Sequence, residues 1–200
     1  MEKVLITGAS GYIALHCIVE LLNNGYAVKG SLRSPNRESQ VRTAIAKKID
    51  TKNNLEFCTL DLTNDDGWEE AMSDCKYVLH VASPFPFSEP KDENDLIIPA
   101  REGTLRALKA AKKSGIKKVI LTSSVAAIQY GHKDSNKRFN HDDWTMIDGT
   151  NVTPYVKSKT IAEKAAWDFI NNQDEKTLEL TVINPSFVLG PSLSDDIGGT

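Results

Sequence analysis

The fold is decided by residues 3–14, which read KVLITGASGYIA: an apolar run, a glycine-rich turn and the start of a helical pattern. Gly8 permits a tight turn, Gly11 lets the backbone approach a pyrophosphate, and the small Ala14 allows a helix to pack close to a strand. The first turn of that helix then presents unpaired N–H groups to an anion. A turn without a ligand is the alternative, but the strand–turn–helix context favours a dinucleotide site. Its predicted contacts are Gly8, Ser10, Gly11, Tyr12 and Ile13.

Outward from this stretch, short apolar runs alternate with helical patterns along the whole chain. Strands are predicted at Lys3–Thr7, Ala27–Leu32, Leu55–Leu60, Tyr77–Ala82, Lys118–Ser123 and Glu179–Asn184. The clearest helical patterns cover Ile13–Leu22, Leu96–Ser114 and Thr160–Asn171, and Pro99 predicts a break or a helix start within the second. This alternation predicts an α/β fold with a doubly wound parallel sheet, the Rossmann fold.

The composition is that of an ordinary globular protein: 200 residues, 40% hydrophobic and 26% charged, with a formal net charge of −3. This balance predicts no basic face for nucleic acid, and no apolar run approaches the roughly 20 residues that span a bilayer. The opening residues MEKVLIT are too short an apolar stretch for a secretory signal. The three widely spaced cysteines are typical of free thiols, and the four histidines show no metal-ligand spacing. The sequence therefore predicts a cytoplasmic protein with no metal, membrane or nucleic-acid partner.

The end of the second predicted strand indicates which dinucleotide is bound. A carboxylate there holds the ribose 2′-hydroxyl of NAD, whereas an arginine suits the 2′-phosphate of NADP. This chain has Arg33 and Arg37 and no carboxylate before Glu38, so NADP is favoured over NAD, although the two arginines could simply be solvated. At the end of the third strand, Asp61-Leu62 could place Asp61 near the adenine amine as part of the cofactor site, or Asp61 could instead cap a helix that begins near residue 64.

The pair Tyr155 and Lys159 is the most specific chemical signal in the chain. Four residues apart, the two side chains share one face of a helix. A phenol has a pKa near 10, and a nearby ammonium favours the phenolate. The fifth strand leads into Ser123 and Ser124, either of which could donate a hydrogen bond to a carbonyl oxygen, although neighbouring side chains point to opposite faces.

With these motifs in place, the chain resembles an extended short-chain dehydrogenase/reductase of the NAD-dependent epimerase/dehydratase superfamily. Within it, the similarity is greatest to the branch of dihydroflavonol, ketone and aldehyde reductases. The matching motifs cover nearly the whole chain in the order of the family. They are Thr7–Ala14, Arg33, Asp61-Leu62, His80–Pro84, Gly103-Thr104, Leu121–Ser124, Tyr155–Lys159, Asn184-Pro185 and Gly190-Pro191.

The resemblance implies a role for each matching residue. Ser124 would polarise the substrate carbonyl, Tyr155 would donate or accept the proton, and Lys159 would tune Tyr155 and bind the nicotinamide ribose. The cofactor would also be lined by Ala82, Ser83, Pro185 and Ser186, with Arg33 reading the 2′-phosphate. The implied activity is NADP-dependent reduction of a ketone or aldehyde to an alcohol, or the reverse oxidation.

Two other functions stay open. Sugar-nucleotide epimerases and dehydratases share the glycine turn and the Tyr-Lys pair, but the segments 80–84 and 100–104 are closer to the reductases. A non-catalytic NADP-binding module or sensor is the second alternative.

The resemblance also bears on domain organisation. Residues 1–190 are predicted to form the NAD(P)-binding domain, and residues 191–200 the start of a substrate-binding region whose C-terminal lobe is missing from this sequence. The substrate is a small carbonyl compound or alcohol that the sequence does not identify. Monomer and homodimer both remain open, because relatives that dimerise do so through helices corresponding to residues 96–114 and 160–171.

Overall fold

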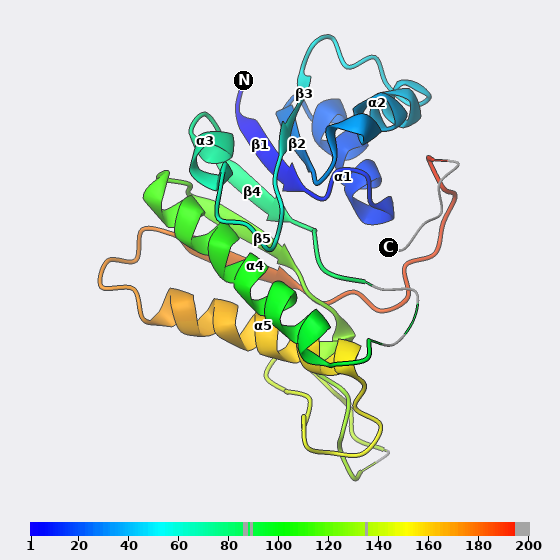
Figure 1. Cartoon of the computed structure of the whole chain (residues 1–200), viewed down its shortest axis with the longest axis vertical. Coiled ribbons are helices and arrows are strands. Elements are labelled where there is room, and N and C mark those ends of the chain that lie inside the picture. The colour runs from blue at the N-terminus through cyan, green and yellow to red at the C-terminus, as the bar shows by residue number, and fades with distance from the viewer. Residues whose placement is uncertain (86–87, 89, 135, 195–200) are drawn as a thin grey trace.

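A computed structural model of the chain describes residues 1–85, 88, 90–134 and 136–194. Its centre is a parallel sheet of six strands in the order β3-β2-β1-β4-β5-β6, and the direction of strand progression reverses between β1 and β4 (Figure 1). The predicted doubly wound Rossmann fold is therefore confirmed. The strands are β1 (Lys3–Thr7), β2 (Ala27–Leu32), β3 (Leu55–Thr59), β4 (Tyr77–His80), β5 (Lys118–Thr122) and β6 (Glu179–Ile183).

Helices cover both faces of this sheet. In Figure 1, α4 and α5 run side by side on one face, whereas α1 and α2 lie on the other. The helices are α1 (Tyr12–Asn23), α2 (Glu38–Ala46), α3 (Trp68–Met72), α4 (Asn94–Lys113) and α5 (Pro154–Asn171), with short 3-10 turns η1 (Pro35–Arg37) and η2 (Val125–Ala127).

Two predicted helix boundaries are wrong. Pro99 does not break α4, which begins at Asn94 and continues through the proline to Lys113, although Pro99 has no N–H to donate to the carbonyl of Asp95. The last helix begins at Pro154 instead of Thr160, with the hydroxyl of Thr153 accepting a hydrogen bond from the N–H of Val156 at 3.3 Å. Both residues of the Tyr-Lys pair thus lie on the first turns of α5.

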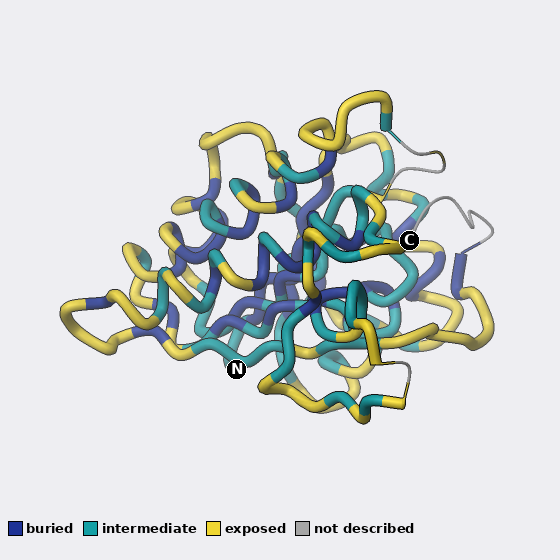
Figure 2. The backbone as a smooth tube through the Cα atoms, turned by 90° about the horizontal axis from the view of Figure 1, so that it is seen from below, coloured by how far each residue is buried: buried dark blue, intermediate teal, exposed yellow. Residues whose placement is uncertain are grey.

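The core consists of two apolar layers, one on each face of the sheet. Adjacent strand residues point to opposite faces, so Leu5 of β1 packs toward α3 and α4 while Ile6 packs toward α1 and α2. The backbone tube in Figure 2 shows the buried segments gathered in the centre of the molecule and the exposed ones on its loops. This rigid sheet fixes the carboxyl ends of the strands relative to one another.

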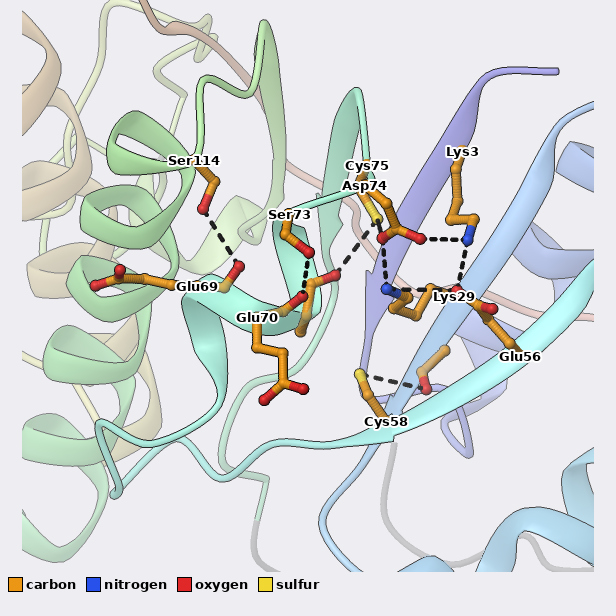
Figure 3. Close-up of polar contacts among 12 residues, drawn as sticks. Lys3, Lys29, Glu56, Cys58, Glu69, Glu70, Ser73, Asp74, Cys75 and Ser114 are labelled. Carbon is orange, nitrogen blue, oxygen red and sulfur yellow. Dashed lines mark hydrogen bonds and ion pairs between the residues drawn. The ribbon is translucent and has the colours of Figure 1, made fainter.

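Toward the amino ends of the strands lies an ion cluster, made of Lys3, Lys29, Glu56 and Asp74 (Figure 3). The ammonium of Lys3 bridges Glu56 at 2.7 Å and Asp74 at 2.5 Å, and that of Lys29 binds Asp74 at 2.5 Å. Because Asp74 lies in the loop between α3 and β4, the cluster connects β1, β2 and β3 to that loop. The nearby Cys58 and Cys75 are free thiols, as is Cys17.

The chain leaving β6 turns back over α1. The ring Nε2 of His16 lies 3.1 Å from the carbonyl oxygen of Pro191, and Leu193 packs into the apolar layer of α1 and α2. A side chain at Gly190 would come within 2.6 Å of the Tyr12 hydroxyl. Residues 195–200, most of the predicted start of a substrate-binding region, lie outside the described residues, so this domain boundary stays a prediction. Over the described residues, no helix has the length and apolar character needed to cross a membrane.

Candidate active site

A cavity of about 1000 Å³ opens at the carboxyl ends of the strands, where the strand order reverses. Open parallel sheets bind their ligands at this position. The loops after all six strands and the first turns of α5 contribute to its walls. Every residue predicted to bind cofactor or take part in catalysis lines this one cavity.

The glycine turn after β1 lines the middle of the sheet's carboxyl end, between the loops after β2 and β4. Gly8 adopts φ of +70°, a conformation that side chains disfavour, and a Cβ there would lie 3.1 Å from the backbone of Ala82. The N–H of Gly11 donates to the carbonyl of Gly8 at 2.9 Å, which closes the turn. Gly11 is also the N-cap of α1 and supplies no side-chain cap, so the first N–H groups of this helix face the cavity unblocked.

A buried contact fixes this turn to the loop after β4. The hydroxyl oxygen of Thr7 accepts hydrogen bonds from the N–H groups of Val81 and Ala82, both at 3.0 Å, and lies 3.0 Å from Nδ1 of His80. Burial, together with the charge of Lys159, lowers the pKa of His80 to about 4, so the ring is neutral near pH 7. Sequence analysis assigned no role to His80 in this contact.

Arg33 and Arg37 lie beside the cavity after β2. Arg37 donates from Nε to Gln40 at 3.1 Å, and the amide of Gln40 donates to the hydroxyl of Ser194 at 3.2 Å. Across from them, hydrogen bonds from the N–H and hydroxyl of Thr63 lower the pKa of Asp61, with the charge of Arg33 acting in the same direction.

Of the two alternatives for Asp61, the helix cap is wrong. The next helix, α3, begins at Trp68 with Gly67 as its N-cap. The Asp61 carboxylate instead closes a local turn through Thr63. The adjoining Leu62 lines the cavity and packs tightly against Gly103 of α4, where an added Cβ would lie 2.7 Å from the nearest Leu62 carbon.

Ser124 and Tyr155 face each other in the cavity, on the side of β5. The Ser124 hydroxyl accepts from the N–H of Ala126 at 3.1 Å and so begins η2. Burial raises the pKa of Tyr155, and a hydrogen bond with Ser124 opposes this increase. On balance the pKa of this phenol is raised, because burial outweighs the hydrogen bond; Nζ of Lys159 lies 5.9 Å from the ring centroid. Ser123 also lines the cavity, but its hydroxyl has no partner among the described residues.

Lys159 is almost fully buried, and this burial lowers its pKa to about 8. The opposing influence is Glu163, one helical turn further along α5, whose charge raises the pKa of Lys159. The carboxylate of Glu163 accepts a hydrogen bond from the side-chain amide of Asn184 at 2.7 Å, and the same amide nitrogen donates to the backbone carbonyl of Ser124 at 3.1 Å. Sequence analysis gave Glu163 no role, although its spacing of four residues from Lys159 was a usable signal.

Comparisons with known proteins identify the family of the chain. Residues 4–198 match the model of a family described as the NAD dependent epimerase/dehydratase family. Cinnamoyl-CoA reductase CAD2 of Medicago truncatula is 37% identical over 196 residues, which cover 95% of this chain and 59% of that protein. Anthocyanidin reductase of Arabidopsis thaliana is 34% identical over 202 residues, covering 98% and 58% of the two chains.

Solved structures give the same result. Gre2 of Candida albicans, solved in complex with NADPH, has a TM-score of 0.83 at 34% identity and covers 96% of this chain and 60% of its own. The chain spans about 60% of the length of the curated relatives that it matches. The motifs, the sheet order and a family match over nearly the whole sequence lead to one conclusion: the chain belongs to the NAD dependent epimerase/dehydratase family.

Proposed function

We propose that this chain forms the cofactor-binding and catalytic part of an NADP-dependent reductase, which converts a ketone or aldehyde to an alcohol or catalyses the reverse oxidation. The observation that carries the proposal is the shared cavity, which is lined both by the glycine turn and by Ser124, Tyr155 and Lys159. The relatives named above, cinnamoyl-CoA reductase and anthocyanidin reductase, support a reductase.

The cavity fits a dinucleotide phosphate. The positive φ of Gly8 and the unblocked helix start at Gly11 supply a close backbone approach and N–H donors for a pyrophosphate. Arg33 and Arg37 supply guanidinium groups for the 2′-phosphate. Gre2, a relative of known structure, was solved with NADPH. When bound, the nicotinamide would supply the hydride.

The protein would supply orientation and a proton. The hydroxyl of Ser124 would donate a hydrogen bond to the substrate carbonyl oxygen as negative charge develops there. Tyr155 holds its proton at neutral pH, because its pKa is raised, and would release that proton to the same oxygen. Lys159 would hold the nicotinamide ribose and offset the negative charge left on Tyr155.

Two alternatives make different predictions. An epimerase or dehydratase is less well supported, since the segments 80–84 and 100–104 are closer to the reductases. A sensor would bind NADPH tightly and turn over no substrate. Fluorescence titration with NADPH, combined with a screen of ketones and aldehydes, distinguishes a sensor from a reductase.

Replacing Tyr155 with Phe tests the assigned chemistry. The variant keeps the ring and loses the proton, so kcat is expected to fall by about 10²–10⁴-fold while NADPH affinity stays within about twofold. Tyr26→Phe, at a tyrosine outside the cavity, is the matched control. The protein should be expressed with whatever coding sequence follows Thr200. Undiminished turnover by the Tyr155→Phe variant would refute the assignment.

A further inference from the structure

Glu163 is a buried carboxylate to which the proposed reaction gives no task. Only 6% of the residue is exposed, and Ala162 and Ala166 beside it on α5 are buried as well. One carboxylate oxygen accepts from the amide of Asn184 at 2.7 Å, and the other lies 3.4 Å from the indole nitrogen of Trp167. Burying a charge is costly unless it is compensated, so these contacts call for an explanation.

The hydrogen bonds lead from Glu163 to the catalytic serine. Asn184 follows β6, and the amide nitrogen that binds Glu163 also donates to the backbone carbonyl of Ser124 at 3.1 Å. That carbonyl accepts a second hydrogen bond, from the N–H of Ala127 at 2.9 Å, and the N–H of Val125 donates to Pro185 at 3.0 Å. Since two acceptor positions of one carbonyl are filled, the backbone that carries the Ser124 hydroxyl is held from both sides.

The charge of Glu163 acts on Lys159 as well. The titratable groups that face Lys159 are Tyr155 and Glu163 on α5 and His80 at the end of β4. Tyr155 and His80 are both uncharged near pH 7, because burial raises the pKa of the first and lowers that of the second. Within the described part of α4, η2 and β6, no charged group changes the pKa of Lys159, which leaves the Glu163 carboxylate as its counter-charge.

We propose that Glu163 is a positioning residue for this site: through Asn184 it fixes the backbone of Ser124, and its charge keeps Lys159 in the ammonium form. The effect on turnover rests on the proposed function, whereas the fixed backbone and the charge of Lys159 are properties of the chain alone. Glu163 thus sets both the position of the Ser124 hydroxyl and the charge of Lys159.

The charge effect is tested in the Glu163→Gln variant, which keeps an oxygen acceptor for Asn184 and removes the negative charge. The protein is labelled with ¹³C at lysine Cε, and NMR follows the titration of Lys159, assigned with a Lys159→Met variant. The pKa of Lys159 is expected to fall by about one unit in Glu163→Gln. Asp168→Asn, which removes an exposed carboxylate from the same helix, should leave it unchanged. An unchanged Lys159 titration in Glu163→Gln overturns the proposal, whether or not the chain proves to be a reductase.

The geometric effect is tested in Asn184→Ala, which removes the link to Ser124 and keeps the carboxylate. We expect faster hydrogen exchange at the amide of Ala127, a loss of about tenfold in kcat, and KM and NADPH affinity within about twofold. The exchange measurement needs no turnover, so it stays decisive if the proposed reaction fails or if Glu163→Gln does not fold. Unchanged exchange, or a loss confined to KM, overturns the proposal.

Discussion

Burial decides the protonation of the single residues around the cavity. It lowers the pKa of Lys159 to about 8 and that of His80 to about 4, and it raises the pKa of Tyr155. Near pH 7 the lysine is therefore charged, the histidine neutral and the phenol protonated. In the proposed reaction a protonated phenol is the form that donates to a developing alkoxide, so near pH 7 Tyr155 is in the form that reduction requires.

The residue-scale prediction for cofactor choice concerns Arg33. If its guanidinium binds the 2′-phosphate, Arg33→Ala should weaken NADPH binding by about tenfold and leave NADH binding nearly unchanged. Isothermal titration calorimetry with both cofactors measures the difference. Arg101→Ala, at an exposed arginine of α4, is the control and should change neither affinity. An equal loss for both cofactors would contradict the assignment.

At the scale of elements, the strands were predictable from the sequence to within two residues, because parallel strands covered on both faces are short apolar runs. The start of α5 was not predicted, because its first two turns carry Tyr155 and Lys159, which line the cavity and interrupt the apolar period. The pair Thr153 and Pro154, an N-cap followed by proline, was the available signal. The short α2, with few apolar residues, was missed for the same reason.

The candidate site, too, was predictable from the sequence only in part. Its predicted residues line the cavity, and each belongs to a short local motif, either at the end of a strand or, for Tyr155 and Lys159, at the start of α5. The contacts of Thr7 with His80, and of Glu163 with Asn184, join residues far apart in the sequence. No local pattern encodes such pairs, so they appear only once the sheet order is known.

The packing of α4 against the loop after β3 gives an element-scale prediction. A Cβ at Gly103 would lie 2.7 Å from Cδ2 and 2.9 Å from Cβ of Leu62, so Gly103→Ala must displace that loop. Overpacking of this kind lowers the free energy of unfolding by about 1–3 kcal/mol, and we also expect weaker NADPH binding. Urea unfolding measures the change. Helix propensity alone predicts the opposite sign, a stabilisation of about 1 kcal/mol, and that outcome would show that the contact is not tight.

At the scale of the whole molecule, the carboxyl ends and the amino ends of the strands have different roles. The cavity lies at the carboxyl ends, whereas the ion cluster of Lys3, Lys29, Glu56 and Asp74 lies toward the amino ends. Burial raises the pKa of Asp74, but hydrogen bonds from Lys29 and Lys3 outweigh it and lower the value to about 2. The cluster thus stabilises the fold away from the cavity, and its effect depends on pH.

The stability that Asp74 contributes to the whole molecule is predicted to depend on pH. A carboxylate with a lowered pKa stabilises the folded state above its unfolded pKa of about 4, and the contribution disappears as the pH falls toward 2. Asp74→Asn should therefore lower the free energy of unfolding at pH 7 and make little difference near pH 2. Chemical unfolding at both pH values tests this, with Asp66→Asn at an exposed site as control. A stability difference that is the same at both pH values would contradict the prediction.

The contacts of Thr7 have a consequence for how a ligand is received. Because its oxygen accepts two N–H groups, its single proton is directed to Nδ1 of His80, so the glycine turn and the loop after β4 share one buried anchor. Two walls of the cavity are thereby preorganised, and a dinucleotide docking there would order little additional backbone at that end. The glycine turn and the loop after β4 lose their conformational entropy when the sheet folds, so ligand binding does not have to order them.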